Sequence, residues 1–256
     1  MSKTWDNKVV LISGGLGDIA LSTALAFGRE GARVALSDIR SDEAAGARLE
    51  QLRSESISFL YHPVDIGDGA AVSRWVAAVD QAWGRIDVAV VNAATVTQKS
   101  IADITAAEWQ AEVQVDLNGA FFLAQQAAIY FSSHQTKGNI VFLGSWAAHA
   151  VHPHIPAYSV AKAGIRMLCQ CMALEFAAQG IRVNEIAPGY VNAGLSKEVW
   201  NQQPALAETA RARVPLGRLI EAGEVADQIL WLCREENRHV TGSCLLMDGG
   251  LSLLRP

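Results

Sequence analysis

A tyrosine and a lysine four positions apart are the residues of this chain best suited to chemistry. Tyr158 and Lys162 lie in the stretch Pro156–Gly164, and on a helix their side chains would share one face, about one turn apart. A free phenol has a pKa of about 10 and is a poor base at neutral pH, but a neighbouring ammonium lowers the pKa of such a group. We therefore expect Tyr158 to pass a proton to or from a substrate oxygen.

A serine thirteen residues before the tyrosine fits the same chemistry. Ser145 follows the apolar run Gly138–Gly144, which is typical of a buried strand. The carboxyl ends of strands are where open α/β sheets bind ligands. A hydroxyl there can hold a substrate oxygen beside Tyr158.

A glycine-rich turn near the start of the chain predicts a dinucleotide site. Residues Ser13–Ala20 follow a short apolar strand, Lys8–Ile12, and precede a helical pattern over Ala20–Glu30. Glycines let the backbone approach a pyrophosphate, and the helix N-terminus offers free N–H groups and partial positive charge. The strand, turn and helix context makes the motif credible.

The next strand ends in a carboxylate that bears on cofactor choice. Arg33–Ser37 is apolar and leads into Asp38, 24 residues after Gly14. A carboxylate at this point accepts hydrogen bonds from the adenosine ribose and repels a 2′-phosphate, so it favours NAD over NADP. Arg40 partly offsets that preference, and the alternative for Asp38 is a solvated turn residue.

The remaining chain alternates strands with helices, which predicts one doubly wound parallel sheet. We expect a single domain over residues 1–256, since no repeat, linker or low-complexity segment interrupts the pattern. The expected strands are Ile57–Tyr61, Val88–Val91, Ile181–Ile186 and Ser243–Met247, and the expected helices are Ser41–Ser54, Val72–Trp83 and Trp109–Ser132.

Composition excludes several classes of protein. The chain has 256 residues, of which 50% are hydrophobic and 18% charged, which suits a large α/β core. A net charge of −5 without a basic block argues against nucleic acid or an anionic membrane as a partner. No signal peptide or apolar membrane span is evident. The 4 cysteines lack metal or redox spacing, so we expect reduced thiols in a cytoplasmic protein.

Taken together, these segments resemble a classical short-chain dehydrogenase/reductase over essentially the whole chain. The resemblance implies a seven-stranded Rossmann-like sheet and hydride transfer between NAD and a secondary alcohol or ketone. It also implies a homotetramer paired through the helices over Trp109–Ser132 and Tyr158–Ala177. Further matching segments are Asp65, Asn92-Ala93, Arg182-Val183-Asn184, Pro188-Gly189, Pro215-Leu216-Gly217-Arg218, Thr241-Gly242 and Asp248-Gly249-Gly250.

The resemblance also implies residue roles. Tyr158 is then the acid/base and Ser145 holds the reacting oxygen. Lys162 binds the nicotinamide ribose and lowers the pKa of the tyrosine. The expected cofactor contacts are Ser13, Gly14, Leu16, Asp18, Ile19, Asp38, Asp65, Ile66, Asn92, Ala93, Ala94, Tyr158, Lys162, Pro188, Gly189 and Val191.

Two departures from the family pattern are carboxylates. Asp18 stands where the family usually has a glycine; it can cap the helix, but it would repel a pyrophosphate. Asp116 stands where a catalytic asparagine helps to hold a water leading to the lysine. Its carboxylate would either accept from that water or pair directly with Lys162. The family's Asn-Asn-Ala-Gly reads Val91-Asn92-Ala93-Ala94, which loses one polar side chain. The usual threonine after Pro-Gly falls at Ala193, with Asn192 next to it.

Substrate specificity is expected in three segments, Trp146–Pro156, Thr95–Ser100 and a polar lid over Tyr190–Val214. The candidate substrate residues are Trp146, His152, Tyr190 and Trp200.

Three histidines, His149, His152 and His154, fall in the first of these segments. We expect no metal there, because zinc sites normally add acidic or thiolate ligands. Histidines and Trp146 around a pocket favour a sugar, polyol or other hydroxylated substrate. The alternative is that they merely line a turn.

Three functions remain open at this stage. The first is an NAD-dependent alcohol or sugar dehydrogenase. The second is a reductase of 3-oxoacyl thioesters, against which Asp38 argues because reductive biosynthesis commonly uses NADPH. The third is a non-catalytic NAD-binding sensor or assembly subunit, in which Asp18 and Asp116 mark lost catalysis.

Overall fold

Seven parallel strands form one sheet in the computed structural model, which describes residues 4–194, 196–197, 200 and 204–254. The strand order is β3-β2-β1-β4-β5-β6-β7, which confirms the predicted doubly wound parallel sheet. Val10 of β1 aligns with Val34 of β2 on one side and Val88 of β4 on the other. The strands are β1 (Val9–Ser13), β2 (Arg33–Asp38), β3 (Phe59–Pro63), β4 (Val88–Val91), β5 (Asn139–Leu143), β6 (Arg182–Pro188) and β7 (Cys244–Met247).

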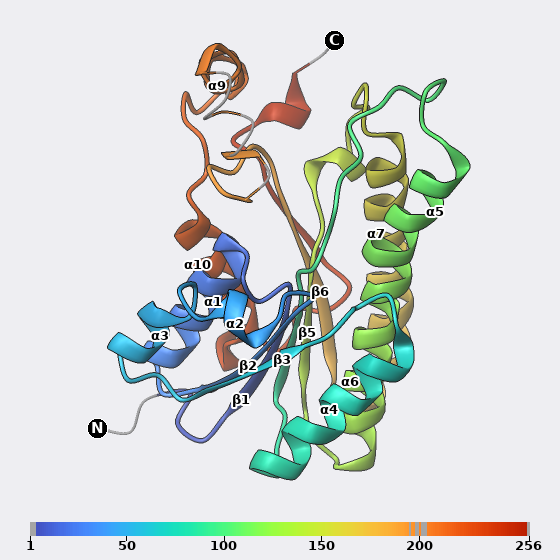
Figure 1. Cartoon of the computed structure of the whole chain (residues 1–256). Helices are drawn as coiled ribbons and strands as arrows, with labels where there is room; N and C mark the ends of the chain where they lie inside the picture. The colour runs from blue at the N-terminus through green and yellow to red at the C-terminus, as the bar shows by residue number, and fades with distance from the viewer. Residues whose placement is uncertain (1–3, 195, 198–199, 201–203, 255–256) are drawn as a thin grey trace.

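Helices cover both faces of the sheet (Figure 1). On one face lie α1 (Asp18–Arg29), α2 (Asp42–Ala45), α3 (Glu50–Ser54) and α10 (Ala222–Cys233); on the other lie α4 (Gly69–Trp83), α5 (Ala106–Val113), α6 (Ala120–Ser133) and α7 (Pro156–Phe176). The remaining helical segments are α9 (Pro204–Arg213), the π-helix η1 (Gln114–Gly119) and the 3₁₀ turns η2 (Trp146–Ala148), η3 (Ala177–Gln179), η4 (Glu235–Asn237) and η5 (Leu251–Leu253). Within the described part of the chain, no helix is long and apolar enough to cross a membrane.

The two-sided cover explains why the central strand is apolar throughout. Val10 and Ile12 pack into the core on the α1 and α10 side, whereas Val9 and Leu11 pack into the core on the α4 and α6 side. All four side chains are fully buried. A strand with both faces covered reads as a continuous apolar run rather than an alternating one.

The order of the strands creates a crevice where the ligand site is expected. The chain moves outward from β1 to β2 and β3, and then returns to the other side of β1 with β4. Such a reversal opens a crevice at the carboxyl ends of the two central strands. The turn after β1 and the segment after β4 therefore face each other.

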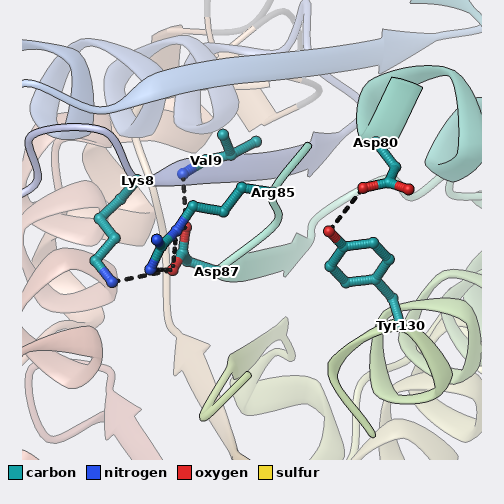
Figure 2. A network of polar contacts seen from close by, with 6 residues as sticks. All are labelled: Lys8, Val9, Asp80, Arg85, Asp87 and Tyr130. Atoms are coloured by element: carbon teal, nitrogen blue, oxygen red, sulfur yellow. Dashed lines mark hydrogen bonds and ion pairs between the residues drawn. The ribbon is translucent and has the colours of Figure 1, made fainter. Parts of the chain in front are cut away.

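The opposite ends of β1 and β4 are held by a buried carboxylate (Figure 2). Asp87 accepts from Lys8 Nζ at 3.1 Å, from the Val9 amide at 3.0 Å and from Arg85 Nε at 2.7 Å. Burial acts to raise the pKa of Asp87, but these hydrogen bonds and charges outweigh it and lower the pKa. The carboxylate thus stays ionised while it fixes the sheet at the edge remote from the crevice.

Two predicted helices differ from those observed in more than the position of an end. Ser41–Ser54 is not one helix but α2 and α3, separated by a turn in which Arg53 donates to the Gly46 carbonyl. The helix expected over Trp109–Ser132 begins earlier, at Ala106, where Thr105 and Glu108 form a capping box. It also contains the η1 π-turn, which hydrophobic periodicity does not reveal.

Candidate active site

Lys162 joins the tyrosine to the strand that precedes the serine. Its side chain is 2% exposed, and Nζ donates to the carbonyl of Leu143, the last residue of β5, at 2.9 Å. The same Nζ lies 5.4 Å from the centre of the Tyr158 ring. Ser145 follows two residues after Leu143, and its buried Oγ accepts from the Ala147 amide at 3.1 Å. The ammonium therefore lies beside the Tyr158 ring, as the spacing predicts, and it links helix α7 to the end of β5, two residues before Ser145.

Asp116 lies in the π-turn and is fully buried. One carboxylate oxygen accepts from the Thr95 amide at 2.7 Å, and the other has no hydrogen-bond partner among the described residues. Burial raises the pKa of Asp116 to about 6, although Lys162 attracts the ionised form. The sequence allowed a direct ion pair between Asp116 and Lys162. The ion pairs of the described residues do not include one. π-turns are frequent at functional sites because they displace a side chain from its helical direction.

The backbone of the glycine turn packs against the backbone that follows β4. Gly14 has φ of +62°, and a Cβ there would lie 2.8 Å from the Ala93 Cα. Ser13 Oγ accepts from the amides of Asn92 and Ala93, and the Asn92 side chain donates to the Ser13 carbonyl at 3.0 Å. Asn92 thus ties the ends of β1 and β4 together. The bare backbone and the N-terminus of α1, which no side chain caps, suit a pyrophosphate.

Asp38 turns from the end of β2 towards this glycine turn. One oxygen accepts from the Leu16 amide at 3.2 Å, and the other from the Arg40 amide at 3.3 Å. Its side chain is partly exposed. The two amides thus fix the carboxylate at the end of β2, beside the glycine turn.

Asp18 is not the helix cap that the sequence suggested. Gly17 occupies the cap position, and the Asp18 carboxylate accepts from Arg48 at 2.5 Å and from the Gly194 amide at 2.9 Å. Burial acts to raise the pKa of Asp18, but the bond to Arg48 and the other partners outweigh it and lower the pKa. Arg48 therefore neutralises much of the negative charge beside the expected pyrophosphate.

Most of the other predicted cofactor residues lie at or just after the carboxyl ends of strands β3, β4 and β6. Asp65 is exposed, while Ile66 beside it is buried against Gly119. Pro188 ends β6, and Gly189 packs closely against Asp248. The remaining predicted contacts are Ile19 in the first turn of α1, Ala94 after β4 and Val191, which forms an isolated bridge with Ile220.

The four candidate substrate residues form one aromatic row. The Trp146 ring lies edge-on to His152, with centroids 4.1 Å apart, and to Tyr190, at 5.1 Å. Tyr190 in turn lies 6.5 Å from Trp200. The structure therefore brings together residues from the segment after Ser145 and from the expected lid. Part of that lid, residues 195, 198–199 and 201–203, lies outside the described residues.

Comparisons with known proteins agree with this geometry. A family model described as enoyl-(acyl carrier protein) reductase matches residues 16–252. Glucose 1-dehydrogenase of Gluconobacter oxydans is 32% identical over 249 residues, which cover 96% of this chain and 92% of that protein. The 3-oxoacyl-(acyl-carrier-protein) reductase of Thermotoga maritima is 33% identical over 246 residues, covering 96% and 98%. The chain belongs to the classical short-chain dehydrogenase/reductase family.

A solved structure extends the likeness to three dimensions. A crystal structure of NAD⁺-bound xylitol dehydrogenase matches with a TM-score of 0.90 and 26% sequence identity. The match covers 97% of this chain and 100% of that chain. This short-chain dehydrogenase/reductase is thus an oxidoreductase of a family that binds nicotinamide cofactors.

Two features of this short-chain dehydrogenase/reductase were not visible in the sequence. Arg48, which neutralises Asp18, comes from the turn between α2 and α3, and no motif marks it. His149 turns away from the aromatic row towards Arg166 and Cys244, and His154 is exposed. Of the three histidines, only His152 contacts the Trp146 ring among the contacts of the described residues, and the position of the histidines around a substrate stays a prediction.

Proposed function

We propose that this protein transfers hydride between NAD and a secondary alcohol or ketone. The observation that carries the proposal is the position of Lys162, bonded to Leu143 at the end of β5 with its ammonium beside the Tyr158 ring. The ammonium favours the ionised phenol, so Tyr158 exchanges a proton with the substrate oxygen. Ser145 donates to or accepts from that same oxygen. The nicotinamide ring, when bound, supplies or accepts the hydride.

The residues around the crevice suit a dinucleotide. Gly14 leaves backbone exposed where a side chain would collide with Ala93, and the uncapped N-terminus of α1 offers free N–H groups. Asp38 supports NAD over NADP, because a fixed carboxylate accepts from ribose hydroxyls and repels a 2′-phosphate. The xylitol dehydrogenase that matches this fold is described as NAD⁺-bound.

The aromatic row supports a small hydroxylated substrate, such as a sugar or polyol. His152 Nδ1 lies 2.7 Å from the Ala150 carbonyl, which makes that nitrogen the donor and leaves Nε2 as an acceptor. Nε2 is buried and has no partner among the described residues. An acceptor next to Trp146 suits a substrate that presents both a hydroxyl and an apolar ring face. Glucose 1-dehydrogenase and xylitol dehydrogenase among the matching proteins agree with this class by name.

A 3-oxoacyl-thioester reductase is the second candidate. The Thermotoga maritima relative carries that name, but Asp38 weighs against the NADPH that reductive biosynthesis commonly uses. A third candidate, a non-catalytic NAD-binding sensor or assembly subunit, draws on the carboxylates at Asp18 and Asp116. The buried and intact Ser145 and Lys162 weigh against it.

Assembly and location complete the proposal. We propose one domain over residues 1–256, with a lid over residues 190–214, acting in the cytoplasm as a homotetramer. The exposed outer faces of α6 and α7 support the assembly, because large apolar side chains on a surface mark contacts between proteins. These side chains are Phe121, Ile129, Val160, Met167 and Leu174.

A substrate panel tests the proposal directly. Wild-type protein and Tyr158→Phe are assayed with sugars, polyols, simple ketones and a 3-oxoacyl thioester, each with NAD(H) and NADP(H). We expect turnover of at least one secondary alcohol with NAD, and a loss of about a hundredfold or more in Tyr158→Phe at unchanged NAD affinity. Bound NAD without turnover of any compound would favour the non-catalytic candidate, and NADPH-dependent thioester reduction would favour the second.

A further inference from the structure

A histidine, a glutamate and a cysteine meet where the segment after Ser145 reaches strands β6 and β7. His149 follows η2, Glu185 lies in the middle of β6, and Cys244 begins β7. One ligand atom of each lies within 4.8 Å of the others, and Cys244 Sγ is 3.4 Å from His149 Nε2. Three segments far apart in the sequence therefore contribute one imidazole, one carboxylate and one thiol to a single point.

The carboxylate at this point lacks the partners that a buried carboxylate needs. Glu185 is 0% exposed; the Cys244 side chain interacts with its carboxyl, but neither oxygen has a hydrogen-bond partner of normal geometry among the described residues. A Cβ on Gly144 would overlap the Glu185 carboxyl, so the glycine makes room for it beside the active-site strand. Leaving such a group unpaired costs free energy, and a bound cation would remove that cost.

The donor set identifies the kind of cation. Imidazole nitrogen, thiolate sulfur and carboxylate oxygen are the three ligand types of zinc sites, whereas Mg²⁺ and Ca²⁺ take oxygen ligands. Bond lengths of about 2.3 Å to sulfur and 2.05 Å to nitrogen place these two atoms roughly 3.5 Å apart around a tetrahedral zinc, close to the observed 3.4 Å. We propose that His149, Glu185 and Cys244 form a binding site for a zinc-type divalent transition-metal ion, with water as the fourth ligand.

Arg166 competes with the cation for the histidine. Its Nη1 lies 3.3 Å from His149 Nδ1, and because a guanidinium can only donate, the ring proton of this arrangement is on Nε2, facing Cys244. Metal binding through Nε2 moves that proton to Nδ1 and requires the guanidinium to turn away. Arg166 therefore stabilises the metal-free orientation of His149. A bound metal would link the segment after Ser145 to β6 and β7.

Cobalt reports on this site, because a thiolate bound to Co²⁺ gives a charge-transfer absorption band. The full-length protein is stripped with a chelator and titrated with Co²⁺ and then Zn²⁺, and metal content is measured after dialysis. We expect one ion per chain, a cobalt–thiolate band that Zn²⁺ removes, and a higher Tm with Zn²⁺. Cys244→Ser should abolish the band, and Glu185→Gln should weaken binding about tenfold or more. Arg166→Met should tighten binding about tenfold.

Matched controls separate this site from adventitious binding. Cys171→Ser removes an exposed thiol and His154→Gln an exposed imidazole, and both should leave the band and the affinity unchanged. The wild-type spectrum and metal content require no variant to fold, so the absence of a cobalt–thiolate band in the wild type overturns the proposal. So does a band that survives Cys244→Ser or that depends instead on Cys169, the buried thiol of α7. These readouts do not depend on hydride transfer, so they stand apart from the proposed function.

Discussion

Replacing Asp116 by asparagine should stabilise the protein most above pH 6, and progressively less as the pH falls towards about 4. Burial raises the pKa of this carboxyl from 3.8 to about 6. A shift of about two pH units corresponds to about 3 kcal/mol between the two protonation states. Because the folded pKa lies above the unfolded one, the folded state binds more protons and loses stability as pH rises from 3.8 to about 6. Above pH 6 the full cost of the buried charge is present.

Asp116→Asn keeps the acceptor for the Thr95 amide but cannot ionise. It leaves one amide N–H₂ without a partner, which costs about 1 kcal/mol. At pH 8 the variant should therefore be about 2 kcal/mol more stable than the wild type. At pH 5 the folded carboxyl is mostly protonated but the unfolded one is ionised, so about half of the cost remains and the advantage should fall below about 1 kcal/mol. It should reverse only as the pH approaches about 4.

Denaturant unfolding at pH 5 and pH 8, followed by tryptophan fluorescence, measures both differences. Asp227→Asn, which changes an exposed carboxylate of α10, serves as the matched control and should give no difference at either pH. A stability change of the same size and sign at both pH values would refute the reasoning. It would mean that ionising Asp116 in the folded state costs no free energy.

Three further substitutions test the cofactor site and the sheet. Asp18→Gly should tighten NAD binding by about three- to fivefold, because it removes a carboxylate beside the pyrophosphate and frees Arg48; a titration that gives equal or weaker affinity contradicts this. Asp38→Asn should raise the NADP-to-NAD ratio of kcat/KM by about tenfold or more, and an unchanged ratio would show that this carboxylate does not face the ribose. Asp87→Asn should lower the free energy of unfolding by about 2 kcal/mol at pH 7. The partners of Asp87 lower its pKa, so its contribution is present above the unfolded value of 3.8 and is lost as pH falls through the folded value; a deficit that persists unchanged in strong acid contradicts the assignment.

Most of the fold could be predicted from the sequence, because the buried parallel strands are continuous apolar runs. Val88–Val91 was predicted to the residue, and the other strands to within about two positions. The division of Ser41–Ser54 into two helices could not be predicted, because a polar surface segment carries little periodicity. The π-turn Gln114–Gly119 could not be predicted either, because a π-turn inserts one extra residue without any distinctive residue type.

In the candidate site, too, local features could be predicted and contacts between distant segments could not. Motifs that rest on local spacing, such as Tyr158 with Lys162, placed their residues correctly relative to each other. Contacts between distant segments were invisible: nothing near Asp18 in the sequence points to Arg48, and nothing near His149 points to Cys244. The sequence named the aromatic candidates one by one, but only the tertiary structure shows that Trp146 lies between His152 and Tyr190.

The row of aromatic rings has an optical consequence. Trp146 and Trp200 flank Tyr190, so two of the chain's 7 indoles belong to the proposed substrate site. Any molecule that enters there changes the polarity around those indoles, and their emission shifts with it. The protein therefore carries its own reporter, and a rapid-mixing experiment could follow ligand entry in real time without attaching a dye.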